Sequence, residues 1–113
     1  MPDLNKPFSL LAFDFGLKQI GVAYGQTLTN SAKGIAIIKA VDGVPQWSEV
    51  GAVIELWTPN IALVGLPINM DGSESVLSGR ARKFARRLHG RFNIDVQMVD
   101  ERLTSREAKS FVR

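Results

Sequence analysis

The chain has 113 residues, a net charge of +3 and no cysteine. This length suits one domain, and the lack of cysteine excludes disulfides and thiolate metal sites within this sequence. Its apolar runs are too short to span a bilayer, and its first residues lack a signal-peptide pattern. We therefore expect a cytoplasmic protein that has no membrane partner.

The predicted elements alternate between strands and helices along the chain. The run 61–66 is apolar throughout, as in a central strand that is covered on both faces, whereas apolar residues recur at helical spacing after residue 76. We expect Gly90 to end that helix and Thr104 to open another one through a capping box with Glu107. The predicted strands are 9–15, 20–26, 34–40, 61–66 and 95–99, and the predicted helices are 47–57, 73–89 and one from 104. The order β-β-β-α-β-α-β-α predicts an α/β fold with a mixed five-stranded sheet and helices packed on it.

Asp14 is a lone carboxylate at the end of the apolar segment 9–15. Removing a charge from water is costly unless another group pairs with it, so this position predicts a metal ion or a phosphate-handling site. Gly16 and Gly21 would let the backbone approach such a ligand closely. The alternative is an aspartate that ends a strand and hydrogen-bonds its own turn.

Two further segments carry polar residues at predicted strand ends. Asp100 and Glu101 follow the last strand, where paired acids are typical Mg²⁺ ligands, although acids there also favour the dipole of a following helix. The loop 65–72 follows a central strand, where open α/β sheets place ligand loops. Its Asn69 and Asp71 could contact a sugar or phosphate, or the loop could be an ordinary turn.

Positive charge is concentrated in one short segment. Residues 80–91 hold six basic residues and no acid, whereas residues 1–79 hold four lysines and seven acids. The six are Arg80, Arg82, Lys83, Arg86, Arg87 and Arg91. Like charges without acidic partners on the same helix favour a polyanionic ligand, so we predict that this helix binds nucleic acid. The alternative is a solvated helix face.

Four segments together resemble the YqgF family of pre-16S ribosomal RNA nucleases, which are also described as Holliday-junction-resolvase-like. The segments are 13–16 with 20–23, 64–72, 80–85 and 100–104. The resemblance implies an RNase H-like fold and a cytoplasmic bacterial endonuclease. Such a protein acts on structured RNA, in 5′-end processing of pre-16S rRNA, or by fold analogy on branched DNA.

The resemblance also implies the roles of particular residues. Asp14 and Glu101 would hold Mg²⁺ or Mn²⁺, Asp100 would be a further catalytic candidate, and Asn69 would contact nucleic acid from the loop that borders the site. Family members continue past this point to a final helix that carries a third aspartate. We therefore expect residues 1–113 to form a single RNase H-like domain that is incomplete at its C-terminal end relative to the family.

Three classes of function remain open from the residues. The first is a metal-dependent phosphodiester hydrolase acting on nucleic acid, which the resemblance would make either an rRNA nuclease or a Holliday-junction resolvase. The second is a non-catalytic nucleic-acid-binding module that uses the basic helix. The third is an actin-like ATPase or sugar kinase, which would need two such domains around a cleft. The oligomeric state, monomer or dimer, stays open as well.

Overall fold

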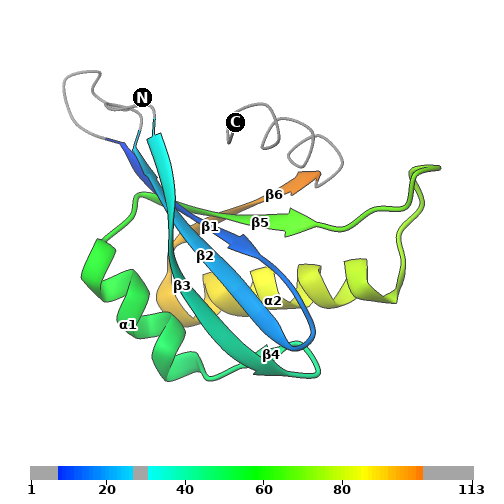
Figure 1. Ribbon diagram of the computed structural model, residues 1–113, viewed down its shortest axis with the longest axis horizontal. Coiled ribbons are helices and arrows are strands. Elements are labelled where there is room, and N and C mark those ends of the chain that lie inside the picture. The colour runs from blue at the N-terminus through cyan, green and yellow to red at the C-terminus, as the bar shows by residue number, and fades with distance from the viewer. Residues whose placement is uncertain (1–7, 27–30, 101–113) are drawn as a thin grey trace.

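The computed structural model describes residues 8–26 and 31–100. The described part contains one mixed sheet and two helices (Figure 1). In chain order the elements are β1 (Ser9–Asp14), β2 (Gln19–Gln26), β3 (Ser31–Val41), β4 (Val44–Pro45), α1 (Trp47–Trp57), β5 (Ile61–Leu66), α2 (Val76–Phe92) and β6 (Asp95–Asp100). The six strands lie in the order β4-β3-β2-β1-β5-β6.

Strand direction decides which ends of the strands meet. β1, β2, β3 and β4 follow one another as antiparallel neighbours. β5 runs parallel to β1, and β6 runs parallel to β5. Because parallel strands end at the same edge, the carboxyl ends of β1, β5 and β6 meet there, as the ligand sites of open α/β sheets require.

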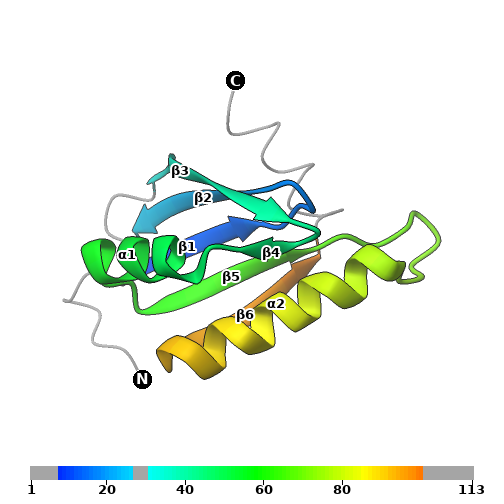
Figure 2. The same ribbon diagram turned by 90° about the horizontal axis from the view of Figure 1, so that it is seen from below.

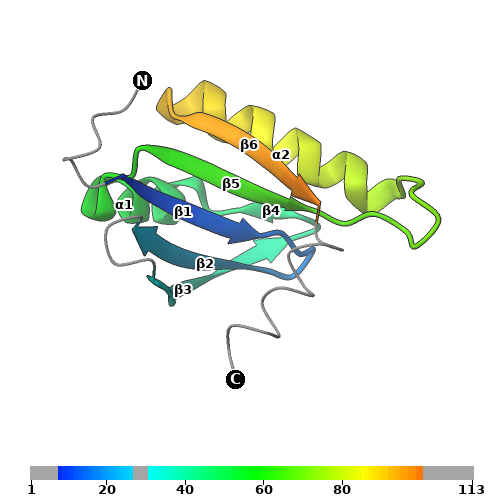
Figure 3. The same ribbon diagram turned by 90° about the horizontal axis from the view of Figure 1, so that it is seen from above.

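Both helices cover the same face of the sheet, as Figures 2 and 3 show from below and from above. Phe84 of α2 lies at the centre of the layer between them, with its ring centroid 5.7 Å from Phe13, 5.6 Å from Phe15 and 5.5 Å from Trp47. No helix among the described elements covers the opposite face. Neither described helix is long and apolar enough to cross a bilayer.

The predicted α/β class and the helix 47–57 are confirmed, but the sheet has six strands instead of five. The additional strand, β4, has two residues and pairs with the end of β3. Asp42 and Gly43 make this pairing possible, because both adopt positive φ, 53° and 83°, and turn the chain back on itself. The helix predicted from Thr104 lies outside the described residues.

The second helix begins and ends three residues later than predicted. Ser75 caps its start, where it accepts a hydrogen bond from the Ser78 N–H, while the Ser78 hydroxyl accepts one from the Ser75 N–H at 3.0 Å. The expected stop at Gly90 is wrong. The helix continues to Phe92 and ends at Asn93, which has a φ of 52° and donates its N–H to the carbonyl of His89 at 2.9 Å. Asparagine here fills the left-handed position that glycine usually takes.

Candidate active site

Asp14 is the last residue of β1 and is exposed to solvent. Phe13, the residue before it, is only 1% exposed and faces the helices. Because successive side chains of a strand alternate between faces, Asp14 belongs to the face that the described helices leave open. Its register partner on β2 is Gly21, where a Cβ atom would lie 3.7 Å from the Asp14 Cβ. The missing side chain at Gly21 leaves one flank of the carboxylate clear.

The turn after Asp14 is fixed by backbone contacts. A Cβ atom at Gly16 would lie 2.5 Å from the carbonyl oxygen of Gln19, so this glycine is needed by the turn itself. The carbonyl of Lys18 accepts a hydrogen bond from the Ala40 N–H at 2.8 Å, which ties the turn to β3. Gly16 therefore has a structural role, whatever ligand Asp14 binds.

Asp100 lies at the same edge of the sheet as Asp14 but on the other face. It is the last residue of β6 and pairs in register with Leu66, which is 5% exposed. Met98 and Val96 lie two and four residues before Asp100 in β6, so their side chains belong to the same face of the sheet. Both are partly buried against the core beneath α2. Asp100 therefore belongs to the helix-covered face. The sequence alone did not predict that Asp14 and Asp100 lie on opposite faces of the sheet.

The predicted second metal ligand, Glu101, lies outside the described residues. Within residues 8–26 and 31–100, no three acidic or histidine side chains gather into a group that could hold a metal ion. The described part of the chain thus contributes one carboxylate, Asp14, to the open face of the sheet at its carboxyl edge.

The loop between β5 and α2 is an ordered turn. Asp71 accepts hydrogen bonds from the Ser73 N–H at 2.9 Å and from the Ser73 hydroxyl at 2.6 Å. The Asn69 side-chain amide donates to that hydroxyl at 3.0 Å. The main-chain carbonyl of Asn69 accepts a hydrogen bond from the Gly72 N–H at 2.9 Å. The Ser78 hydroxyl donates to the carbonyl of Pro67. Of the two roles considered for this loop, the turn is observed, and contact with nucleic acid stays a prediction.

Two of the six basic residues have acidic partners, contrary to the expectation of an unpaired block. The Arg80 guanidinium contacts the carboxylate and the carbonyl oxygen of Asp42, both at 2.8 Å. Arg82 binds Glu74 through two hydrogen bonds of 2.9 and 2.6 Å. The hydrogen bond from Arg82 lowers the pKa of Glu74, and Glu74 raises the pKa of Arg82. Neither acid lies on α2, so helical spacing gave no sign of these pairs.

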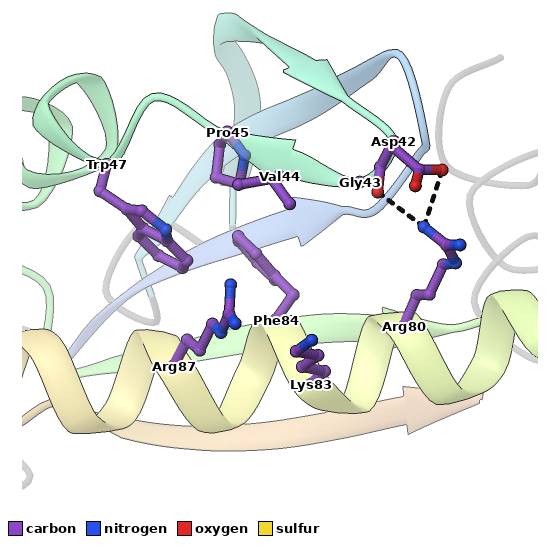
Figure 4. Close-up of a pocket in the computed structure, with 9 residues that line it drawn as sticks. All are labelled: Asp42, Gly43, Val44, Pro45, Trp47, Arg80, Lys83, Phe84 and Arg87. Atoms are coloured by element: carbon purple, nitrogen blue, oxygen red, sulfur yellow. Dashed lines mark hydrogen bonds and ion pairs between the residues drawn. The ribbon is translucent and has the colours of Figure 1, made fainter.

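The basic residues of α2 divide between two flanks. Arg80, Lys83 and Arg87 line a cavity of about 370 Å³ below the β3–β4 turn (Figure 4). Arg82 and Arg86 line a second hollow of about 290 Å³ against β6. Within the described part of the chain, Lys83, Arg86 and Arg87 form no ion pair. The Arg91 guanidinium lies over the Trp47 ring, 4.7 Å from its centroid.

Comparison with known proteins gives a consistent family. The family model described as "RuvX: Holliday junction resolvase" matches residues 8–113. A protein of Coxiella burnetii (strain Dugway 5J108-111) named "Putative pre-16S rRNA nuclease" is 58% identical over 105 residues, which cover 93% of this chain and 74% of that protein. A protein of Marinobacter nauticus with the same name is 53% identical over 112 residues, which cover 99% of this chain and 78% of that protein.

Solved structures agree on the fold. Thermus thermophilus RuvC in complex with a Holliday junction superposes with a TM-score of 0.54 at 14% identity, covering 82% of this chain and 64% of RuvC. Archaeoglobus fulgidus Pelota superposes with the same TM-score and identity, covering 85% of this chain and 27% of Pelota. The fold is therefore RNase H-like, as the resemblance implied. The match over residues 8–113, together with relatives more than half identical, shows that this chain belongs to the RuvX (YqgF) family of Holliday-junction-resolvase-like proteins.

Proposed function

We propose that this chain forms a single RNase H-like domain of a divalent-metal-dependent endonuclease, which hydrolyses phosphodiester bonds in 5′-end processing of pre-16S rRNA. The observation that carries the proposal is Asp14, an exposed carboxylate at the carboxyl edge of the sheet and on its open face. The names of the relatives support the RNA substrate. Because ribosomal RNA is made in the cytoplasm, we propose that the protein acts there.

Asp14 suits a hard divalent cation such as Mg²⁺ or Mn²⁺. Carboxylate oxygens are the ligands that these ions prefer, and Gly21 leaves space beside this one. We propose Glu101 as the second ligand, with Asp100 a weaker candidate because it belongs to the helix-covered face. The family resemblance implies a third aspartate beyond these two. A divalent ion bound here would supply Lewis-acid stabilisation of charge on the phosphate.

The residues of α2 would attract and orient the nucleic acid. Lys83, Arg86 and Arg87 are exposed cations, and they form no ion pair within the described part of the chain. Each phosphate that such side chains neutralise releases counterions, so binding should weaken steeply as salt rises. Recognition of structured RNA through its backbone depends mostly on shape. Asn69, at the same edge of the sheet as Asp14, would add a polar contact from the loop after β5.

The test compares two aspartates that differ in their place on the sheet. Asp14→Asn should lower Mn²⁺-dependent cleavage of precursor ribosomal RNA at least about 100-fold, because it removes a metal ligand, and should leave RNA affinity nearly unchanged. Asp95→Asn makes the same change at the opposite end of a parallel strand, where Asp95 is exposed, and should cleave like the wild type. Undiminished cleavage by Asp14→Asn would refute the metal role.

A second substrate follows from the family description, Holliday junction resolvase. A four-way DNA junction and a linear duplex of the same sequence should be included in the same assay with Mg²⁺ and Mn²⁺. Selective cutting of the junction would favour resolvase activity over rRNA processing. Binding without cleavage of either RNA or DNA would instead favour the non-catalytic nucleic-acid-binding module.

A further inference from the structure

We propose that the cavity between α2 and the β3–β4 turn holds one unpaired nucleotide of the substrate. Lys83 and Arg87 would bind its phosphate, and Trp47 would contact its base. This inference rests on the proposed nucleic-acid ligand and adds the form that the ligand takes, a single-stranded or locally unpaired segment. The site is separate from Asp14, which lies on the other face of the sheet.

The size of the cavity favours one nucleotide over a duplex. Its volume of about 370 Å³ lies near the lower end of the range for small-ligand pockets, roughly 300–1,000 Å³. Figure 4 shows the cavity between α2 and the turn, with Arg80 reaching Asp42 at one end and Trp47 at the other. A base that is paired and stacked in a duplex could not enter, so the occupant must be unpaired.

The walls of the cavity have two different chemistries. One wall carries Lys83 and Arg87, which form no ion pair within the described part of the chain, whereas Arg80 is held by Asp42. The other wall is apolar and includes Pro45, Trp47 and Phe84. A ligand that joins an anion to a flat apolar ring complements both walls. Nucleotides have this character, and single strands are commonly bound by cations along the backbone and aromatic side chains against the bases.

Trp47 is held in place before any ligand arrives. Its ring stacks on Phe84 with centroids 5.5 Å apart and planes inclined by 16°, and the Arg91 guanidinium lies 4.7 Å from its centroid. The side chain is nevertheless only partly buried. Because Phe84 and Arg91 both lie over the ring, a base would meet the edge of Trp47 and not an open face. A side chain that is already fixed loses little entropy on binding, which favours this contact.

The cavity also adjoins the turn that follows Asp14. Gly43, which lines the cavity, donates its N–H to the carbonyl of Leu17 at 2.9 Å, and Leu17 lies in the β1–β2 turn. A Cβ atom at Gly43 would lie 2.9 Å from the Phe15 ring, so the two turns are packed closely together. A strand with one nucleotide in the cavity could therefore continue past this turn toward the edge where Asp14 lies.

The first experiment uses the two flanks of α2 as a matched pair. Lys83→Glu with Arg87→Glu changes the cavity, and Arg82→Glu with Arg86→Glu makes the same change of charge on the opposite flank. We expect the cavity variant to bind a single-stranded oligoribonucleotide at least about tenfold more weakly than the control variant does. For a duplex of the same sequence, we expect both variants to lose the same amount of affinity relative to the wild type. Equal losses for the single strand would overturn the proposal. Circular dichroism establishes that both variants are folded.

The second experiment observes Trp47 directly. The chain has two tryptophans, so Trp57→Phe leaves Trp47 as the sole tryptophan fluorophore. Saturating single-stranded oligonucleotide should quench this fluorescence, and the Lys83→Glu with Arg87→Glu change should abolish the quenching at the same concentration. An unchanged signal at saturation in the parent would overturn the cavity site.

The two proposals can fail separately. Quenching that persists in Asp14→Asn while cleavage is lost supports both. Quenching without cleavage by the unmodified chain on any substrate supports the cavity and refutes the nuclease. Metal-dependent cleavage without quenching refutes the cavity and leaves the nuclease standing.

Discussion

Gly16 lies directly against the backbone of Gln19. A Cβ atom at position 16 would stand 2.5 Å from the Gln19 carbonyl oxygen, closer than such atoms approach in folded proteins. The obstructing atom belongs to the main chain, so no rotation of a side chain can relieve the contact. The turn that follows Asp14 therefore depends on glycine for its shape.

Gly16→Ala should destabilise the protein by about 1–3 kcal/mol, because the turn must move to make room for the methyl group. Urea denaturation measures this loss. Gly34→Ala is the control, since nothing lies within 4 Å of a Cβ at that position in β3. Equal stability of Gly16→Ala and the wild type would show that the turn adapts without cost.

Glycines inside α2 offer the opposite effect. Gly79 and Gly90 are exposed, and a Cβ at either would meet nothing within 4 Å. Alanine restricts the unfolded chain and favours the helix, so each substitution should stabilise the protein by about 0.5–1 kcal/mol. Thermal unfolding of the two single variants and the double variant tests this prediction. Lower melting temperatures for both would contradict it.

Sequence patterns predicted the regular elements well where strong signals bounded them. The strand 61–66 and the helix 47–57 have the predicted limits, since an apolar run marks the first and Thr58-Pro59 ends the second. Strand β4 could not be predicted, because two residues show no periodicity. The end of α2 was misplaced because Asn93 occupies the left-handed position that a glycine rule had assigned to Gly90.

The sequence predicted which residues belong to the candidate site, but not the faces of the sheet on which they lie. Strand order and direction bring Asp14 and Asp100 to one edge of the sheet, in keeping with the single site that the family resemblance implied. The register that separates their faces required the structure. The pairing of Arg80 with Asp42 joins residues 38 positions apart. Helical spacing considers neighbours three or four residues away, so such a contact is beyond its reach.

Phe84→Ala should be the most destabilising of the changes considered. Phe84 is 3% exposed and contacts the rings of Phe13, Phe15 and Trp47. Removing a buried phenylalanine costs about 3–5 kcal/mol, a large part of the total stability of a small domain. Chemical denaturation should show this loss, with Phe84→Leu retaining most of the stability. A loss below about 1 kcal/mol would mean that the core collapses around the vacancy.

The pair of Glu74 and Arg82 predicts a weak dependence of stability on pH. Because Arg82 lowers the pKa of Glu74, the pair contributes fully above the ordinary pKa of 4.5, and the contribution is lost as pH falls through the lowered value. Both side chains are substantially exposed, so the effect should be small. Glu74→Gln should melt slightly below the wild type at pH 7, and the difference should shrink as the pH falls below 4.5 and vanish below the lowered pKa of Glu74. A difference that grows on acidification would contradict this assignment.

Asp14 and Asp100 should differ sharply in their importance for cleavage. Asp14 projects from the open face, whereas Asp100 belongs to the face beneath α2, so one metal site cannot use both carboxylates equally. We expect Asp100→Asn to retain Mn²⁺-dependent cleavage within about tenfold of the wild type, against a loss of at least about 100-fold for Asp14→Asn. Single-turnover rates on the same RNA measure both. Equal losses would show that Asp100 reaches the metal ion despite its position in the sheet, and would move it into the catalytic set beside Asp14.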